Sequence, residues 1–257
     1  MLKSCGIIYV ATGKKYIAEA FANASISRRF APAYTFSLIT DRPFDATESP
    51  FDYVYKHPSP TYSYRDKISG LLSLSARYNL FLDSDAFLVS NPSPLFSAST
   101  RFDLMGSYAP VRKPPGWNDE SLPSALPEIN TGALLLKRTF KTKLFIKRWL
   151  KLYDLLLQTY GQKWDQASFR SVLFNRANFL SPSFGVLPSE CNLRTTKPWL
   201  AGRGLPVFVV HGRFNYDELS DFIHFLNSDI DRFRTFDSWL HFYPDSSIRP
   251  RFDRTYS

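Results

Sequence analysis

The chain has 257 residues, a formal net charge of +9 and two cysteines, Cys5 and Cys191. Two cysteines exclude a disulfide framework, and 44% apolar with 21% charged residues is typical of a globular chain rather than a disordered one. The chain ends carry no dense basic block, so we expect no nucleic-acid partner. The apolar run at residues 6–12 is too short for a secretory core or a membrane span. We therefore expect a soluble, cytoplasmic protein, whose oligomeric state the composition leaves open.

The first half of the sequence alternates apolar runs with helical stretches. The apolar and aromatic runs have the length of strands, and the segments between them have helical spacing. Strands that alternate with helices predict an α/β fold, with a mixed, mainly parallel sheet flanked by helices. Ligands of such sheets bind at the carboxyl ends of the strands. The expected strands are residues 6–10, 35–40, 51–55 and 78–82, and the expected helices are residues 15–30 and 64–76.

The second half of the sequence is less regular. Residues 108–128 hold five prolines and predict a long irregular loop, of the kind that forms lids and binding loops or is disordered. Residues 132–136 predict a strand, and residues 138–160 predict a long amphipathic helix with a basic polar face. Such a face fits solvent, and it also fits a membrane surface, so peripheral membrane contact stays open. A last buried strand is expected at residues 206–210, followed by a helical extension.

The apolar run 78–82 is followed by two carboxylates, Asp83 and Asp85, one residue apart. On an extended chain, residues i and i+2 point to the same side, so both carboxylates can face one ligand. Oxygen ligands suit a hard divalent ion such as Mg²⁺ or Mn²⁺, which keeps positions open for substrate phosphates. The pair predicts a metal-bridged diphosphate site. The alternative is a turn in which one carboxylate caps a helix.

Phosphatases of the haloacid-dehalogenase type also place Asp-x-Asp after a buried strand. They usually carry Thr or Val two residues past the second Asp, and their motif follows the first strand. Phe87 stands at that position here, and several strands precede the motif. We therefore disfavour this interpretation.

Further segments accompany the pair in a fixed order. Upstream stand Arg65 and Lys67, and downstream come Glu-Ile-Asn-Thr-Gly at 128–132, Trp-Asp-Gln at 164–166 and Val-Val-His-Gly at 209–212. The series resembles GT-A-fold glycosyltransferases, closest to the glycogenin and galactosyltransferase-like family 8 group. Those enzymes carry a first-strand Ala-Thr with a following Tyr, a Lys-Leu helix, a Leu-Asp-x-Asp strand, a Phe-Asn-x-Gly segment, an Asp-Gln pair and a late His-x-x-Gly.

The resemblance spans residues 6 to about 214 and implies one GT-A (Rossmann-like) catalytic domain over residues 1–257. Residues 1–107 would form the nucleotide-sugar-binding half, residues 108–214 the acceptor half, and residues 215–257 a helical C-terminal extension. The implied activity is metal-dependent transfer of a sugar from a nucleotide-sugar donor, a UDP-sugar first, to a carbohydrate or other hydroxyl acceptor, with retention of configuration.

The resemblance also assigns roles to single residues. Asp83, Asp85 and His211 would bind Mn²⁺ or Mg²⁺. Asp165, Gln166 and Lys67 would act on the transferred sugar and the leaving diphosphate. The implied donor-binding residues are Ala11, Thr12, Tyr16, Asp41, Arg65, Lys67, Asp83, Ser84, Asn130, Gly132, Gly212 and Arg213.

The sequence departs from the family pattern in two places. The family's Lys after the late His is absent, and Arg213 could replace it, since a guanidinium binds phosphate oxygens well. Ile129 stands where the family has Phe. If the enzyme inverts, a carboxylate must deprotonate the acceptor, and Asp119, Glu120 and Glu128 lie in or beside the long loop.

Three other functions compete with sugar transfer. A metal-dependent sugar nucleotidyltransferase usually has a Gly-rich basic loop after the first strand, and only Gly13-Lys14-Lys15 is present here. A sugar- or nucleotide-binding protein without turnover is favoured by the aromatic residues, Trp117 among them. A nucleic-acid binder has only the net charge in its favour.

Overall fold

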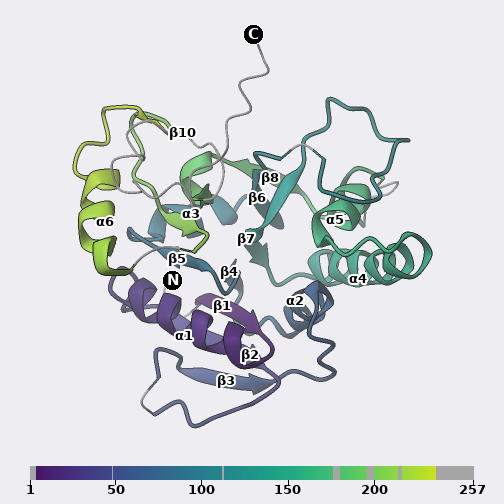
Figure 1. The fold of residues 1–257 in the computed structure, drawn as a ribbon, viewed down its shortest axis with the longest axis horizontal. Helices are drawn as coiled ribbons and strands as arrows, with labels where there is room; N and C mark the ends of the chain where they lie inside the picture. The colour runs from purple at the N-terminus through teal and green to yellow at the C-terminus, as the bar shows by residue number, and fades with distance from the viewer. Residues whose placement is uncertain are drawn as a thin grey trace.

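The computed structural model describes residues 4–47, 49–111, 113–175, 180–195, 200–213 and 216–235. A seven-stranded sheet with the order β3-β2-β1-β4-β7-β6-β8 forms its centre (Figure 1). Neighbouring strands are parallel except at β7, which is antiparallel to both β4 and β6. The expected mixed, mainly parallel α/β sheet is confirmed. Its strands are β1 (Cys5–Ala11), β2 (Thr35–Thr40), β3 (Tyr53–Lys56), β4 (Tyr78–Leu82), β6 (Leu104–Tyr108), β7 (Ile129–Lys137) and β8 (Phe184–Leu187).

Helices cover both faces of this sheet (Figure 1). Successive strand residues point to opposite faces, so Ile7 and Tyr9 pack into one core while Ile8 and Val10 pack into the other. The first core contains side chains of α1 and α3, and the second contains side chains of α2, α4 and α5. These helices are α1 (Lys14–Arg28), α2 (Tyr64–Gly70), α3 (Ser93–Ser99), α4 (Phe140–Tyr160) and α5 (Asp165–Phe174).

A second, smaller sheet was not expected from the sequence. It has the order β5-β11-β9, with β5 at Ala86–Leu88, β11 at Val209–His211 and β9 at Leu193–Arg194. Helix α6 (Leu219–Asn227) packs on it through Leu219, Phe222 and Leu226. A further short pair joins β10 (Leu200–Ala201) to β12 (Arg234–Thr235). The smaller sheet begins directly after Asp85 and ends at His211, so it determines where both residues lie.

Several expected boundaries were wrong. The expected strand 132–136 is the nine-residue β7, so Asn130 and Gly132 lie inside a strand rather than in a turn before it. The expected helix 64–76 ends at Gly70, a weak helix former, and a single 3₁₀ turn follows at Leu71–Ser73. The last expected strand, 206–210, is β11 and includes His211.

Helix α4 confirms the expected long amphipathic helix. The Thr139 side chain accepts a hydrogen bond from the backbone N–H of Thr142 and caps its start, and Gly161 ends it in the left-handed conformation at φ 64°. Trp149 on its inner face is fully buried. The lysines at 143, 147 and 151 are exposed on its outer face, so the peripheral membrane contact stays a prediction.

The long loop between β6 and β7 is held by side chains from outside it. The amide of Gln162, just after α4, donates to the backbone carbonyls of Pro115 (3.1 Å) and Trp117 (2.5 Å). The guanidinium of Arg170 on α5 donates to the carbonyls of Pro123 and Leu126. The described part of the loop is thus docked on the connection between α4 and α5.

The region expected to form a helical extension, residues 215–257, begins with α6, and residues 236–257 lie outside the described residues. In the part of the chain that the structure describes, no helix has both the length and the apolar character to cross a membrane.

Candidate active site

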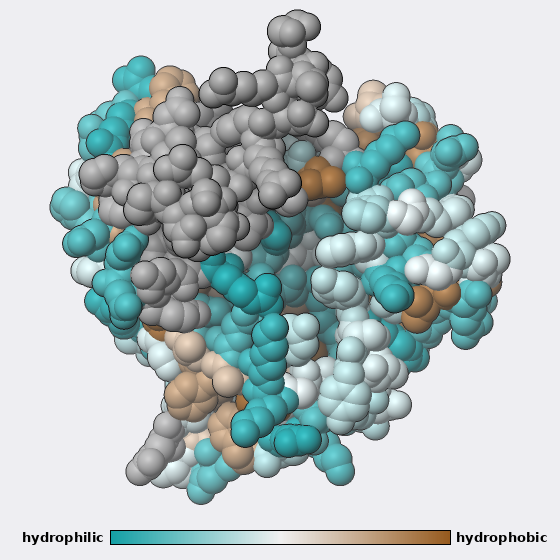
Figure 2. Space-filling model, in the orientation of Figure 1, coloured by the Kyte–Doolittle hydropathy of each residue, from teal (hydrophilic) through white to brown (hydrophobic). Residues whose placement is uncertain are grey.

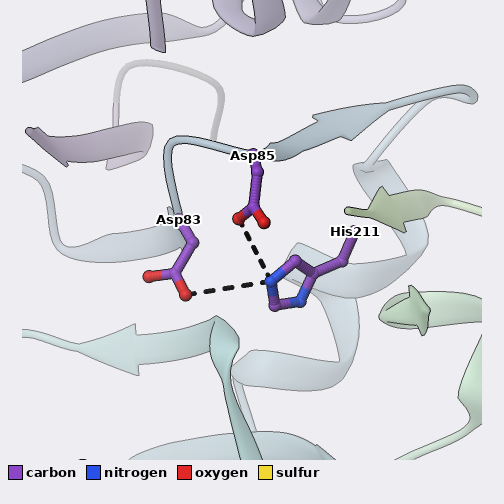
Figure 3. A group of neighbouring side chains, drawn as sticks. All are labelled: Asp83, Asp85 and His211. Carbon is purple, nitrogen blue, oxygen red and sulfur yellow. Dashed lines mark ion pairs between the residues drawn. The ribbon is translucent and has the colours of Figure 1, made fainter. Parts of the chain in front are cut away.

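Asp83 and Asp85 lie in the turn that joins β4 to β5. The backbone N–H of Ala86 donates to the carbonyl of Asp83 at 3.0 Å, so these residues form a turn and not the expected extended chain. Both carboxylates nevertheless face the imidazole of His211 (Figure 3). Nε2 of His211 lies 3.3 Å from a carboxylate oxygen of Asp85 and 3.8 Å from one of Asp83.

The smaller sheet brings His211 to this turn. His211 pairs with Ala86 on antiparallel β5, and the N–H of Gly212 donates to the carbonyl of Asp85 at 2.8 Å. Backbone hydrogen bonds between β5 and β11 thus bring together Asp85 and His211, which are 126 residues apart in the sequence (211 − 85). The register of β5 and β11 therefore produces the expected proximity of Asp85 and His211.

The imidazole is oriented by neighbouring amides. Nδ1 of His211 lies 2.8 Å from the amide oxygen of Asn192, which can only accept, so Nδ1 carries the proton. The Asn192 amide in turn donates to the side-chain oxygen of Asn130 at 3.1 Å. Nε2 faces the two carboxylates, where a proton on it stabilises both, and a divalent ion bound between them would replace that proton and take the Nε2 lone pair.

Gly132 makes room for the same ring. A Cβ at this position would lie 1.9 Å from Cε1 of His211, a separation that no side chain tolerates. The imidazole of His211 therefore occupies the space that the absent side chain of Gly132 leaves. Any larger residue at this point of β7 would displace the imidazole from the carboxylates.

Arg194 is a site residue that sequence reasoning missed. It pairs with His211 across β9 and β11, and its Nη1 lies 2.6 Å from Nε2 of that histidine. The side chain is half-buried and forms no ion pair within the described residues. No motif marks this arginine, because β9 is only two residues long and its pairing with β11 joins distant parts of the chain.

Lys67 joins two carboxylates in the interior. Its Nζ lies 3.2 Å from both oxygens of Asp83 and 3.0 Å from an oxygen of Asp165. The hydroxyl of Thr131, also missed by sequence reasoning, donates to Asp165 at 2.6 Å and lies 3.2 Å from Nζ. Burial alone would lower the pKa of Lys67, but Asp165 and Asp83 hold it above its ordinary value. Lys67 is therefore a permanent positive charge at the centre of the site.

The two turn carboxylates differ in their surroundings. Burial raises the pKa of Asp83 above its ordinary value, although the Lys67 ammonium opposes this shift. Burial alone would also raise the pKa of Asp85, but the positive charge of the protonated His211 ring, a hydrogen bond from that ring and the guanidinium groups of Arg194 and Arg213 hold it low. Asp85 is thus ionised throughout the physiological range and suited to bind a cation.

The donor set fits a divalent metal ion. One ligand atom from each of Asp83, Asp85 and His211 lies within 4.8 Å of the others, and this is the cluster of metal-binding type found among the described residues. Two carboxylates and a neutral imidazole suit Mn²⁺ or Mg²⁺ better than a soft ion. Nη1 of Arg194 lies 2.6 Å from Nε2 and 3.0 Å from Nδ1 of the same ring, so a metal ion at Nε2 would compete with this guanidinium for space.

The residues expected to bind the nucleoside lie around the carboxyl ends of β1 and β2. The hydroxyl of Thr12 donates to Asp66 at 2.6 Å, and the carboxylate of Asp41 accepts the N–H of Gly13 at 2.8 Å. Ala11 is buried at the end of β1, and Tyr16 is exposed on α1. In this structure Thr12 and Asp41 stabilise the connection between β1 and α1.

Arg65 and Arg213 each pair with a carboxylate outside the cluster of Asp83 and Asp85. Arg65 forms two hydrogen bonds to Asp154 on α4, at 2.8 and 3.2 Å, so the structure does not place it beside Lys67 in the site. Arg213 has a side chain that is 61% exposed and pairs with Glu19 at 3.0 Å. The hydroxyl of Ser84 donates to the same Glu19.

Three more expected residues, Gly212, Asp165 and Gln166, have structural roles. Gly212 has a φ of 132°, and a Cβ there would lie 2.1 Å from the hydroxyl of Thr195, so the turn after β11 requires glycine. Asp165 is the first residue of α5 and is buried against Lys67, while Trp164 occupies the N-cap position. Gln166 is half-buried and donates to the carbonyl of Ile129 at 3.0 Å.

The three candidate acceptor bases have different environments. Burial raises the pKa of Glu128 to about 8, against the opposing charge of Arg170, whose Nε lies 3.8 Å away. One carboxyl oxygen of Glu128 has no hydrogen-bond partner within the described residues. The carboxylate of Asp119 accepts hydrogen bonds from Ser121 and Asn175. Glu120 is exposed. None of the three contacts the carboxylate cluster directly.

Comparison with solved structures shows the same fold in glycosyltransferases. The galactosyltransferase LgtC, solved with donor and acceptor sugar analogues, matches with a TM-score of 0.59 and 14% identity, over 86% of this chain and 96% of that one. The glycosyltransferase GlyE of Streptococcus pneumoniae TIGR4 matches with a TM-score of 0.54 and 14% identity, over 74% of this chain. The match spans about half of the GlyE chain, 46%.

Sequence comparison gives the family. No curated protein matches the chain. The family model of the nucleotide-diphospho-sugar transferases matches residues 33–221, which include the turn with Asp83 and Asp85 and the strand with His211. The match covers more than half of the chain, and the mixed α/β sheet agrees with the fold of the glycosyltransferase structures. The chain therefore belongs to the nucleotide-diphospho-sugar transferase family.

Proposed function

We propose that this protein is a metal-dependent glycosyltransferase that moves a sugar from a nucleoside-diphosphate donor, a UDP-sugar, to a hydroxyl group with retention of configuration. The observation that carries the proposal is the cluster of Asp83, Asp85 and His211, in which Asn192 holds Nδ1 of the imidazole and Nε2 faces the carboxylates. Family membership supports the donor class.

The reaction breaks the bond between the anomeric carbon and a diphosphate oxygen, and the bonding electrons leave with the nucleoside diphosphate. The acceptor hydroxyl oxygen forms the new bond to the same carbon, and its proton passes to the leaving diphosphate. A bound divalent ion supplies positive charge to that leaving group. In the chain itself, the growing negative charge is stabilised by the buried ammonium of Lys67 and the guanidinium of Arg194.

The charges of the site support diphosphate binding. Asp83, Asp85 and Asp165 carry three negative charges, and Lys67 and Arg194 carry two positive charges, so these side chains sum to −1. A divalent cation would change the sum to +1, which attracts an anionic donor. Without Arg194 the loaded site would be neutral. This arginine therefore has a role that the sequence analysis had given to Arg213.

The remaining roles follow from placement. We assign Ala11, Thr12, Tyr16 and Asp41 to the nucleoside, because they surround the carboxyl ends of β1 and β2. We assign Gln166 to the transferred sugar, since its side chain is partly exposed beside buried Asp165.

We also keep the division into halves as a proposal. Residues 1–107 would supply Lys67 and the two turn carboxylates. Residues 108–214 would supply Asp165 and His211. On this division both halves build one site, because Lys67 contacts Asp165 and His211 contacts Asp85.

The test is release of nucleotide from a panel of UDP- and GDP-sugars with Mn²⁺, with Mg²⁺ and with EDTA. We expect slow donor hydrolysis without an acceptor, dependent on the metal and lost in Asp85→Asn. The matched control is Asp45→Asn, a carboxylate in an exposed loop that only caps Thr47. Pyrophosphate release from a nucleoside triphosphate would instead indicate a nucleotidyltransferase. Equal hydrolysis by Asp85→Asn and the wild type would refute the assignment of the metal site.

A further inference from the structure

Two aromatic side chains, Tyr64 and Trp164, form a stacked pair on the protein surface. Their ring centroids are 5.6 Å apart, with 29° between the ring planes. Tyr64 is 41% exposed and Trp164 is 39% exposed, so the stack leaves part of each ring in water. Aromatic rings offer a large apolar area together with a polar atom, which makes exposed pairs effective binding surfaces.

The aromatic pair borders the candidate active site. Tyr64 begins α2, the helix that carries Lys67, and Trp164 directly precedes Asp165 at the start of α5. Nζ of Lys67 lies 5.5 Å from the centroid of the Tyr64 ring. Helix α2 lies beside α4, and α4 beside α5, on one face of the sheet (Figure 1). A ligand bound to the aromatic pair would therefore lie next to the charged cluster of Lys67, Asp83 and Asp165.

Hydrogen bonds hold the backbone beside both residues of the pair, and the two rings contact each other. The backbone N–H of Trp164 donates to the side-chain oxygen of Gln162 at 2.9 Å, and the Gln162 amide is bonded to the long loop. The start of α2 is fixed by the two hydrogen bonds from Arg65 to Asp154. Preorganised side chains lose little conformational entropy on binding, which favours weak ligands with few contacts.

We propose that the Tyr64–Trp164 pair is the acceptor subsite, and that the acceptor is a carbohydrate whose pyranose ring stacks on the pair. This inference rests on the proposed sugar transfer. A pyranose ring has an apolar face of C–H groups that matches a flat aromatic ring, and hydroxyl groups around its rim. The phenol O–H of Tyr64 and the indole N–H of Trp164 have no hydrogen-bond partner within the described residues, so both are available to those hydroxyls.

The coloured part of the surface in Figure 2 suits such a ligand better than an acyl chain. Among the residues coloured there, the hydrophobic ones occur in small separate groups between hydrophilic ones. An acyl chain needs an extended apolar groove, whereas a single sugar ring needs only a ring-sized apolar face with polar surroundings. The aromatic pair has these dimensions, and the charged cluster beside it supplies the polar surroundings.

The test separates acceptor binding from donor chemistry. Trp164→Leu and Tyr64→Leu are compared with the wild type for donor hydrolysis without acceptor, and for transfer to lactose, maltose and methyl N-acetylglucosaminide. A matched control is the stacked pair of Tyr53 and Tyr55 on edge strand β3, three strands away from β4, with centroids 6.0 Å apart. Circular dichroism confirms that each variant is folded.

We expect Trp164→Leu to raise the KM for the glycan acceptor at least tenfold while donor hydrolysis stays within twofold of the wild type. Trp164→Phe should recover most of the loss, since it keeps an aromatic face. Quenching of tryptophan fluorescence by the glycans should disappear in Trp164→Leu and persist in Tyr53→Leu. This binding signal does not depend on turnover.

Three results would overturn the inference. An unchanged KM for the acceptor in Trp164→Leu would exclude the aromatic pair as the acceptor subsite, while donor hydrolysis would still support sugar transfer. A wild-type enzyme that hydrolyses its donor but binds none of the three glycans, or that transfers the sugar to a serine peptide instead, would exclude a carbohydrate acceptor. A wild-type protein that releases nucleotide from no donor would remove the proposed function and the acceptor subsite together.

Discussion

Replacing Gly132 with alanine is expected to push His211 out of the carboxylate cluster. The added Cβ would lie 1.9 Å from Cε1 of the ring, about 1.6 Å inside the ~3.5 Å contact distance of two carbon atoms. The φ angle of Gly132 lies outside the left-handed region, so alanine meets no backbone strain there. Overpacking a buried site costs roughly 1–3 kcal/mol, and loss of the hydrogen bond from Nδ1 to Asn192 costs about 1 kcal/mol more. We expect Gly132→Ala to lower the free energy of unfolding by about 2–4 kcal/mol.

The assay is a double-mutant cycle measured by urea unfolding. His211→Ala removes the ring that the new Cβ would meet, so in that background Gly132→Ala should cost less than about 1 kcal/mol, and the coupling energy should be about 2 kcal/mol or more. Each protein is also titrated with Mn²⁺ by calorimetry. Gly132→Ala should lose Mn²⁺ binding to the same extent as His211→Ala, because both remove the imidazole from Asp83 and Asp85.

The reasoning is refuted if Gly132→Ala costs the same with and without the imidazole. That result would mean that the Cβ disturbs the pairing of β7 with its neighbours and not His211. Wild-type affinity for Mn²⁺ in Gly132→Ala would equally contradict the inference that the glycine keeps His211 in place.

Three more predictions concern charged groups. Lys67→Met leaves the carboxylates of Asp83 and Asp165 without their shared cation and should lower the free energy of unfolding by about 3–5 kcal/mol. A loss below about 1 kcal/mol in urea unfolding would contradict the buried position of Lys67 between these carboxylates. Burial raises the pKa of Glu128 from 4.5 to about 8, so the free energy of unfolding of the wild type should fall as pH rises between these values, by up to about 1.4 kcal/mol per pH unit. Glu128→Gln should lack this fall. If the melting temperatures of the two proteins change in parallel from pH 5 to 9, the raised pKa of Glu128 is excluded. Arg194→Met should bind Mn²⁺ more tightly, because no guanidinium then competes for Nε2 of His211. The same variant should bind UDP about tenfold more weakly, since it lacks a cation for the diphosphate. If calorimetry gives wild-type affinities for both ligands, Arg194 is not part of the site.

The long elements of the fold were predictable because each has a pattern of its own. The strands β1, β2 and β4 and the helix α4 were confirmed within a few residues. Their apolar periodicity is local, and it extends over enough residues to separate a strand from a helix. The direction of β7 was not predictable in this way. Strand direction depends on the path of the preceding loop, which has no periodicity.

The smaller sheet could not be predicted from the sequence for a different reason. Its strands β5 and β9 have three and two residues, too few for any periodic pattern. Missing them meant missing Arg194, which reaches the site only through the pairing of β9 with β11. The grouping of Asp83, Asp85 and His211 was still anticipated, but from the resemblance to a family. The local reasoning about an extended chain was wrong, since the two carboxylates lie in a turn.

Burial was the other property that the sequence did not show. A cation near the start of a helix usually faces water, and the resemblance assigned donor binding to both Arg65 and Lys67. The structure turns Lys67 inward, onto Asp83 and Asp165, and turns Arg65 outward onto Asp154. The difference arises from helix geometry, because residues two apart on a helix lie on nearly opposite sides.

The reversed direction of β7 has a consequence for how this scaffold can change. In a parallel strand, the residues at the active edge lie in the loop after the strand, and they move when that loop is altered. Because β7 runs the other way, Asn130, Thr131 and Gly132 reach the same edge from within the strand: Asn130 pairs with Ser107 on β6, and the carbonyl of Gly132 accepts the N–H of Asp83, although the register with β6 is irregular between these contacts. The long loop before β7 can therefore gain, lose or exchange residues while the strand holds these three in place. Variation in substrate range can accumulate in that loop at little cost to the catalytic geometry.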